Sequence, residues 1–151
     1  MRRVAVGRAY TGPNGVRRSY DEATAALDVA VRLSLPDPVV DAADLLVYQV
    51  LRRDRAAISD LVNSLLTPLT RARGGAGPLL GTLEAYFSSG RVAASAARQL
   101  HLSVRAVTYR LARVAELTGK DPSDPEDALA LHVAVLGARL LDWPATPLET
   151  A

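Results

Sequence analysis

Two stretches of helical periodicity, separated by a very short turn, dominate the hydrophobic pattern of the chain. The first covers residues 92–100, and its apolar positions recur at spacings of three and four: Ala93, Ala96, Ala97 and Leu100. His101 and Leu102 interrupt it. Ser103 is a favourable N-cap residue for a second helix, although Ala106 stands where a capping box has Glu or Gln. Two helices joined in this way are typical of the helix-turn-helix motif, in which the second helix reads DNA.

The second stretch predicts a helix of about four turns that begins at Val104 and stops at Gly119. One face of this helix is apolar and consists of Val104, Val107, Leu111, Val114 and Thr118. The opposite face carries Arg105, Tyr109, Ala112 and Arg113, with Arg110 on the flank. The pattern therefore predicts a helix that buries one stripe and presents a stripe rich in arginine.

Amphipathic patterns flank this pair on both sides. The apolar positions before it, which end at Ser88, Ser89 and Gly90, are Leu79, Leu80, Leu83, Tyr86 and Phe87. After it, Asp124 is the expected N-cap and Pro125 the first helical residue. The last helix has a broad apolar face that consists of Leu129, Val133, Leu136 and Leu140, with Val135 and Leu141 beside them. We expect this face to cover the helix-turn-helix, and it can also contact a partner. Trp143 and Pro144 end the helix, and the sequence from Trp143 onward is expected to fray.

The first 53 residues mix short strand patterns with helices. Val4 and Val6 predict a strand that runs into a turn at residues 11–15, and Val39 and Val40 predict another after two prolines. Between them, Ser19 and Glu22 match a capping box at the head of a helix that extends to about Leu33. Asp41 or Asp44 is the expected cap of a helix through Leu51. Because strands without sheet partners are marginal, we expect this part to be an α/β remnant.

Residues 54–78 are expected to connect this remnant to the rest. Asp54 is the expected cap of a helix that contains Ile58, Leu61, Val62 and Leu65, and Thr67 with Pro68 predicts a short restart. The clearest linker is the sequence RARGGAGP at residues 71–78. The chain is thus predicted to be mainly α: a small α/β remnant at 1–53, connecting helices and linker at 54–78, a helix-turn-helix bundle at 79–143 and a tail at 144–151.

The run from Leu79 to Leu141 resembles the C-terminal helix-turn-helix domain of the PucR/CdaR family of bacterial transcription regulators, which is similar to the Fis type of DNA-binding module. The strings that carry this resemblance are LLGTLEAYFSSG, AARQLHLS, YRLARVAELTG and DPEDALALHVAVL. Near the N-terminus, GRAYTG followed by SYDEA resembles the closing strand and helix of the degenerate GGDEF-like domain that precedes this module in CdaR-type regulators. The resemblance therefore implies a Fis-like helix-turn-helix bundle after a truncated GGDEF-like segment.

The family typically opens its recognition helix with an Arg-Asn-Thr-Leu-Arg run, and this chain departs from that pattern with VRAVT at residues 104–108. Val104 in place of arginine removes one possible bidentate base contact and moves the available guanidinium about 100° around the helix axis. We hypothesise that base specificity is weakened or altered in consequence.

The charge distribution agrees with a DNA-binding segment. The net charge of the chain is +2, but residues 91–120 contain six Arg or Lys against the single acid Glu116. Residues 121–151 contain six acids against Arg139. A basic segment inside a nearly neutral chain is expected of a module that neutralises phosphates, although a solvated helix face gives the same pattern.

Individual roles on the basic segment follow from its helical positions. Arg105, in the first turn, is best placed to reach a guanine edge. Phosphates are the expected partners of Arg98, Arg110 and Arg113, and the hydroxyls of Thr108 and Tyr109 suit either bases or phosphates. Ser103 and Ala106 complete the predicted DNA-binding set. Two alternatives stay open: Arg110 paired with Glu116 or an acid of the last helix, and Tyr109 partly packed.

The sequence gives little support for a metal site or for enzyme activity. Without cysteine, no disulfide or thiolate site is possible, and His101 and His132 are too few for a zinc site. We expect His101 to be a turn residue and His132 a surface or packing residue. There is no GxSxG elbow and no phosphate-cradling loop. The resemblance implies that the catalytic signature of a nucleotide cyclase belongs upstream of the GRAYTG segment. No enzyme activity, catalytic residue, cofactor, metal or identifiable small-molecule ligand is expected.

The N-terminal apolar run is too short for a signal peptide or a membrane span, so we expect a cytoplasmic protein with no membrane association. The predicted function is a transcription regulator that binds double-stranded DNA and reads the major groove with the helix after Ser103. One module contacts few base pairs, which favours a homodimer or pairing with a full-length relative. The alternative is a truncated, non-catalytic interaction protein that dimerises with full-length relatives without productive DNA binding.

Overall fold

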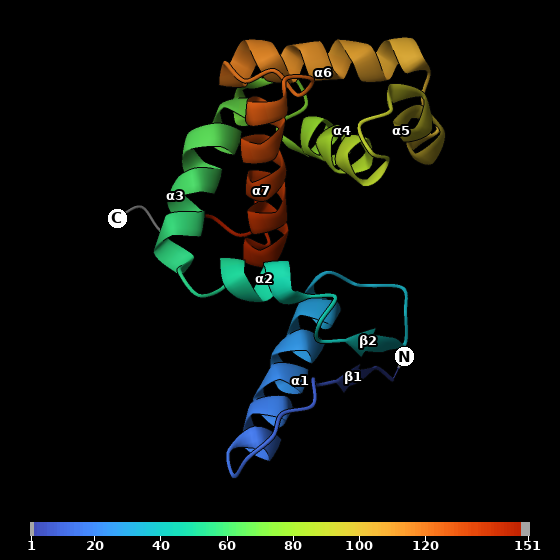
Figure 1. The fold of residues 1–151 in the computed structure, drawn as a ribbon. Coiled ribbons are helices and arrows are strands. Elements are labelled where there is room, and N and C mark those ends of the chain that lie inside the picture. Colours follow the sequence, from blue (N-terminus) through green and yellow to red (C-terminus); the bar gives the residue numbers. More distant parts are fainter. Residues whose placement is uncertain (1, 149–151) are drawn as a thin grey trace. The chain divides into compact units, whose positions relative to one another are not determined.

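The structure, a computed structural model, describes residues 2–148. In this range the chain is mainly α-helical and has one sheet of two strands, so the predicted fold class is confirmed. The chain divides into two compact units, Met1–Ala56 and Ala57–Ala151, whose elements are labelled in Figure 1. The division of the chain into functional segments at residues 53, 78 and 143 stays a prediction.

The first unit consists of a short parallel sheet with one long helix packed on it. Its elements are β1 (Val4–Val6), α1 (Gly15–Arg32), β2 (Val39–Asp41) and α2 (Leu46–Leu51). Val4 pairs with Val39 in a parallel register, so each predicted strand is the other's partner. Helix α1 packs against both strands and buries Ala26, Val29 and Ala30 completely. Parallel strands need such a crossover, because a tight hairpin cannot join them.

Helix α1 begins at Gly15, one turn earlier than the capping box at Ser19 predicts, and that prediction is wrong. The carboxylate of Glu22 accepts hydrogen bonds from the Arg8 guanidinium and the Tyr10 hydroxyl, so it is not free to cap. These contacts, with Arg8 first, lower the Glu22 pKa to about 2. Gly7 allows the close approach of this segment to α1, because a Cβ there would lie 2.1 Å from the Ser19 carbonyl oxygen.

The expected acidic cap of α2 is also wrong. The N-cap position of α2 is Leu45, whose aliphatic side chain cannot accept a hydrogen bond from the first turn of the helix. Asp41 instead accepts a hydrogen bond of 2.9 Å from the backbone N–H of Ala43, in the turn before the helix. Its short side chain satisfies the nearest free donor and does not reach α2.

The second unit is a bundle of helices. It contains most of α3 (Arg55–Leu66), then the 3-10 helix η1 (Thr67–Arg71), α4 (Gly77–Ser88), α5 (Ala93–Leu100), α6 (Val104–Thr118) and α7 (Pro125–Leu141). Helices α4, α5 and α6 pack on one another, α7 packs on α4, and η1 packs on α6 (Figure 1). The fully buried side chains of its core are Val62, Leu66, Leu69, Leu83, Val107, Val114, Leu131 and Val135. The elements predicted on either side of the helix-turn-helix are confirmed.

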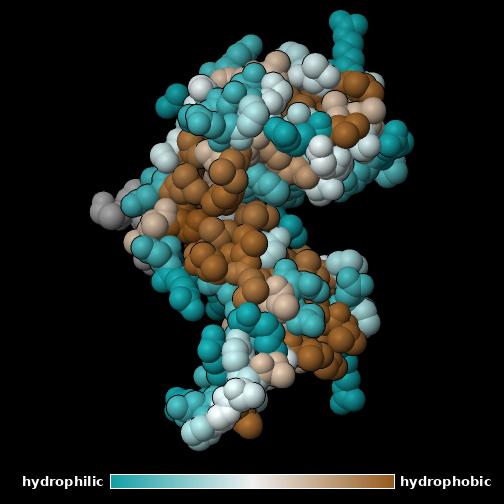
Figure 2. All heavy atoms as spheres, in the orientation of Figure 1, coloured by the Kyte–Doolittle hydropathy of each residue, from teal (hydrophilic) through white to brown (hydrophobic). Residues whose placement is uncertain are grey.

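The packed face of α7 agrees with the predicted one only in part. Leu129 is 66% exposed, and Val133 and Leu136 are partly exposed. Val135, Leu140 and Leu141 are buried as predicted, together with Leu131 and the small residues Ala128, Ala134 and Ala138. Small side chains allow a close helix approach, and at Gly137 an added Cβ would lie 3.2 Å from both Ile58 and Val62 of α3. In Figure 2, hydrophobic atoms gather over α7 and hydrophilic atoms predominate along α6.

Trp143 does not fray as predicted. Its side chain is 9% exposed, and its backbone N–H donates to the Ala138 carbonyl at 2.9 Å. Residues 149–151 of the predicted tail lie outside the described residues.

Candidate nucleic-acid interface

The turn between α5 and α6 has the geometry that its residues predict. His101 ends α5 in the left-handed conformation, with φ of 54°, and the Leu102 N–H donates to the Ala97 carbonyl at 2.9 Å. Ser103 then caps α6, because its hydroxyl accepts a hydrogen bond of 3.1 Å from the Ala106 N–H. These caps fix both helix ends and make the turn short.

Helix α6 buries the middle of its predicted apolar face. Val107 and Val114 are completely buried, and Gly119 ends the helix with φ of 71°. Val104 was expected on this face but is 48% exposed. The first turn of α6 is therefore open on more sides than the periodicity predicts.

The exposed face of α6 carries Arg105 and Tyr109. Tyr109 is 71% exposed, which excludes the alternative of a packed ring. Arg105 is exposed, and its guanidinium makes no hydrogen bond or ion pair with any residue in 2–148. On α5, Arg98 is exposed and donates only to the Ser95 hydroxyl, at 3.0 Å. Two guanidinium groups are thus free of carboxylates on this side of the motif.

Arg110 and Arg113 have partners that sequence reasoning did not assign. Arg110 donates from Nη1 to the hydroxyl of Thr82, a buried residue of α4, at 3.4 Å, so neither acidic partner proposed for it is found. Glu116 pairs with Arg113 instead, with 2.7 Å between Arg113 Nη1 and Glu116 Oε2. Three residues apart on a helix, these two side chains share a face. Arg110 is therefore partly committed to the bundle, and Arg113 is held by an exposed ion pair.

The other two predicted site residues lie in the first two turns of α6. The Thr108 hydroxyl donates to the Val104 carbonyl at 2.9 Å, so its proton is used within the helix while its oxygen can still accept. Ala106 is partly exposed between Ser103 and Tyr109. Both residues lie on the same stretch of helix as Arg105, as predicted.

A depression of about 650 Å³ adjoins the exposed face of α6. Arg105, Tyr109, Arg110 and Arg113 of α6 line it, and so does Arg73. Sequence reasoning missed Arg73, since it lies in the segment taken for a linker. The excess of arginine in RARGGAGP was the one available signal.

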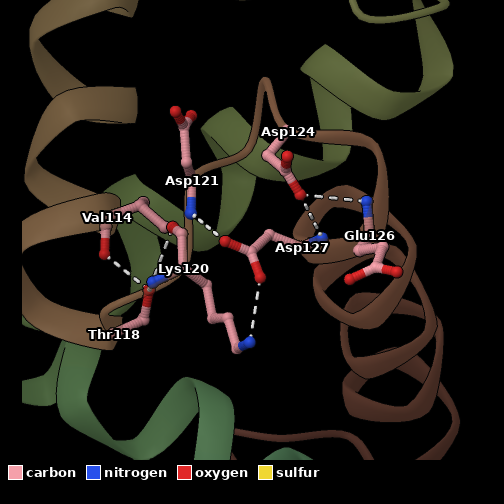
Figure 3. Close-up of polar contacts among 7 residues, drawn as sticks. All are labelled: Val114, Thr118, Lys120, Asp121, Asp124, Glu126 and Asp127. Carbon is pink, nitrogen blue, oxygen red and sulfur yellow. Dashed lines mark hydrogen bonds and ion pairs between the residues drawn. The ribbon is translucent and has the colours of Figure 1, made fainter.

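The loop between α6 and α7 is bonded to the first turn of α7 (Figure 3). The Lys120 ammonium lies 2.9 Å from Asp127 Oδ1, and the other oxygen of Asp127 accepts a hydrogen bond from the Asp121 N–H. The Lys120 contact lowers the Asp127 pKa, and Asp127 raises the Lys120 pKa. Asp124 caps α7 by accepting from the Glu126 and Asp127 N–H groups at 3.0 and 3.1 Å. These contacts hold the loop after α6 against the first turn of α7.

The two histidines have different environments. His101 occupies the turn, and the ring of His132 stacks on Phe87 with 4.6 Å between centroids. Burial lowers the His132 pKa. Within the described part of the chain, no three His, Cys, Asp or Glu side chains gather as a metal site requires. None of the helices in residues 2–148 is both long and apolar enough to cross a membrane.

Comparison with protein families assigns two segments. Residues 79–136 match the PucR C-terminal helix-turn-helix domain, and residues 2–29 match a GGDEF-like domain. The first segment includes α5, the turn and the whole of α6, so the match covers every predicted DNA-binding residue.

Individual relatives agree with this assignment. An uncharacterized protein of Mycobacterium tuberculosis is 35% identical over 139 residues, which cover 91% of this chain and 32% of that protein. The carbohydrate diacid regulator of Escherichia coli is 31% identical over 138 residues, covering 88% of this chain and 34% of that regulator. The chain thus spans about a third of the length of these curated relatives.

A solved structure is also similar. The crystal structure of a regulator of polyketide synthase expression from Bifidobacterium adolescentis superposes with a TM-score of 0.52 and 30% sequence identity. The similar part covers 87% of this chain and 54% of that one. The similarity therefore extends beyond the helix-turn-helix to most of the described chain.

Proposed function

Residues 79–136 belong to the family of PucR C-terminal helix-turn-helix domains, and we propose that this chain is a DNA-binding transcription regulator whose helix α6 reads the major groove. The observation that carries the proposal is the exposed, unpaired Arg105 in the first turn of α6, directly after the cap at Ser103. Recognition helices of this motif present their N-terminal residues to base edges. Two of the relatives are themselves named regulators.

The roles of the arginines follow from their partners. Arg105 contacts a guanine edge through N7 and O6, for which the planar guanidinium is suited. Arg98 and Arg113 contact phosphates, since each is exposed and bound only to a hydroxyl or a surface carboxylate that water or phosphate can replace. Arg110, which donates to Thr82, orients α6 on α4. It adds positive charge near the DNA and makes no direct contact with a phosphate.

Selection of binding sites from a pool of random duplexes tests the proposal. The wild-type chain should enrich a motif, and Arg105→Ala should relax one position of it at a cost of about 1–3 kcal/mol in affinity. Arg98→Ala is the matched control: it should weaken binding to all sequences by a similar factor. No enrichment by the wild type, or an unchanged motif with Arg105→Ala, would overturn the proposal.

Val104 offers a second test of the same surface. Because Val104 is half exposed at the start of α6, Val104→Arg can restore the guanidinium that the family places there without disturbing the core. Band-shift titration on the same fragments should show a gain in affinity or selectivity. An unchanged titration would count against the hypothesis that this substitution weakens base reading.

We also propose that the chain binds DNA as a homodimer or paired with a longer relative, because one recognition helix contacts too few base pairs for tight specificity. Sedimentation should show a dimer on a selected duplex. Only monomers, free and bound, would remove this part of the proposal.

The competing function is an interaction protein that pairs with longer relatives without productive DNA binding. The altered start of α6 is the observation that favours it. Salt dependence separates the two, because the logarithm of affinity for B-DNA falls with the logarithm of salt concentration at roughly −0.9 per phosphate neutralised. Binding without such a slope, or none at all, would favour the interaction protein.

A further inference from the structure

We propose that Arg73, in the turn between η1 and α4, contacts the phosphate backbone beside the groove that α6 enters. The turn, residues 72–76, is then a second DNA-binding element. This inference rests on the proposed function, since it assigns a further contact to the same bound duplex. It concerns a segment before the start of the matched helix-turn-helix domain at residue 79.

Arg73 shares a depression with the exposed face of α6. The depression of about 650 Å³ is lined by Arg73 and Gly75 of the turn and by Arg105, Tyr109 and Arg113 of α6. Helix η1, which precedes the turn, packs directly on α6. Because Arg105 and Arg73 line the same depression, a duplex that receives Arg105 in its groove is expected to bring a bordering strand near Arg73.

The charge of the depression fits a polyanion. Four arginines line it, and no carboxylate does among the described lining residues. Arg73 is exposed and has no hydrogen-bond or ion-pair partner within residues 2–148. Cationic side chains from two elements around one depression concentrate anions there. A DNA strand satisfies both elements at once, since its phosphates repeat along the backbone.

The turn that carries Arg73 is ordered by its own backbone. The Ala72 N–H donates to the Leu69 carbonyl at 3.1 Å, and the Gly75 N–H donates to the Ala72 carbonyl at 2.9 Å. Gly74 and Gly75 have φ of 96° and 78°, a backbone conformation that residues other than glycine rarely adopt. The backbone at Arg73 is therefore placed before DNA binds, and less backbone freedom is lost on contact.

The test is the salt dependence of binding to one duplex by the whole 151-residue chain, measured by fluorescence anisotropy. Arg73→Ala should make the log–log slope shallower by about 0.9, which corresponds to an affinity loss of about eightfold near 0.1 M salt. Arg73→Lys should retain the wild-type slope, since it keeps the charge. Arg71→Ala is the matched control, because Arg71 is exposed two residues away but does not line the depression.

Each outcome decides between the proposals. A wild-type chain that binds with a steep slope, together with an unchanged slope for Arg73→Ala, overturns the Arg73 contact and leaves the proposed function standing. Equal losses for Arg71→Ala and Arg73→Ala also overturn it, because they indicate a general charge effect. A wild-type chain without salt-dependent binding overturns the proposed function, and the contact with it. Far-UV circular dichroism of each variant confirms that its helices are intact.

Discussion

Replacing Glu116 with glutamine should strengthen the binding of duplex DNA, because it releases Arg113. The two side chains form an ion pair of 2.7 Å on the surface of α6, where they are 63% and 40% exposed. Arg113 lines the basic depression, so a bound phosphate and Glu116 compete for the same guanidinium. Glutamine has nearly the shape of glutamate and removes only the charge.

The size of the effect follows from the exposure of the pair. Ion pairs between solvent-exposed side chains contribute about 0.2–1 kcal/mol. Relief of a competition of that size raises affinity about 1.4-fold to 5-fold. If Arg113 gains a phosphate that it does not contact in the wild type, the log–log salt slope also steepens by about 0.9.

Fluorescence anisotropy with the wild type, Glu116→Gln, Arg113→Ala and the double variant measures this effect as a double-mutant cycle. The gain from Glu116→Gln should be largest when Arg113 is present. Unchanged or weaker binding by Glu116→Gln would refute the competition. So would an equal gain in the Arg113→Ala background, since that gain would come from net charge alone.

Three further predictions concern the stability of the two units. Ser103→Ala and Asp124→Ala should each lower the free energy of unfolding by about 1 kcal/mol in urea titrations, because each removes an observed N-cap; Ser103→Thr should lose less. The folded-state pKa of Glu22 is lowered, so the stabilisation that Glu22 gives should be fully present above its ordinary pKa of 4.5 and lost as pH falls to about 2. The difference in Tm between the wild type and Glu22→Gln should therefore shrink over that pH window. A constant difference would contradict the assignment. Gly7→Ala should destabilise the first unit by about 1–3 kcal/mol, because its Cβ would overlap the Ser19 carbonyl; an unchanged thermal transition would show that β1 and α1 separate easily.

Sequence reasoning succeeded where a few neighbouring residues decide the structure. Ser103, Gly119 and Asp124 act as helix signals through hydrogen bonds or backbone angles within three residues of themselves, and all three positions are confirmed. The two short strands were also found, because β-branched residues and flanking turn residues mark them locally.

Sequence reasoning failed where contacts between residues distant in sequence compete with a local signal. The capping box at Ser19 was wrong because Arg8 and Tyr10, more than ten residues earlier, take the carboxylate of Glu22. The face of α7 was predicted only in part: Val135, Leu140 and Leu141 are buried, but the close approach of α3 and α4 also buries small residues that the prediction did not include.

The candidate site was predicted in outline but not in its pairings. Arg110 was considered as a partner of Glu116, although a separation of six residues places the two on different faces of a helix; Arg113, three residues away, is the partner. The arginines of RARGGAGP were the only sequence signal for Arg73, and they could not place it beside α6, because that position depends on the packing of η1.

The central claim is that the first turn of α6 enters the major groove, and methylation protection of guanine N7 tests it most directly. N7 lies in the major groove, and Arg105 is the exposed side chain assigned to it. On a selected duplex, the wild-type chain should protect at least one guanine N7, and Arg105→Ala should leave that position reactive while other contacts persist. Binding without any N7 protection, or protection that survives Arg105→Ala unchanged, would contradict the assignment of this helix as the one that reads DNA.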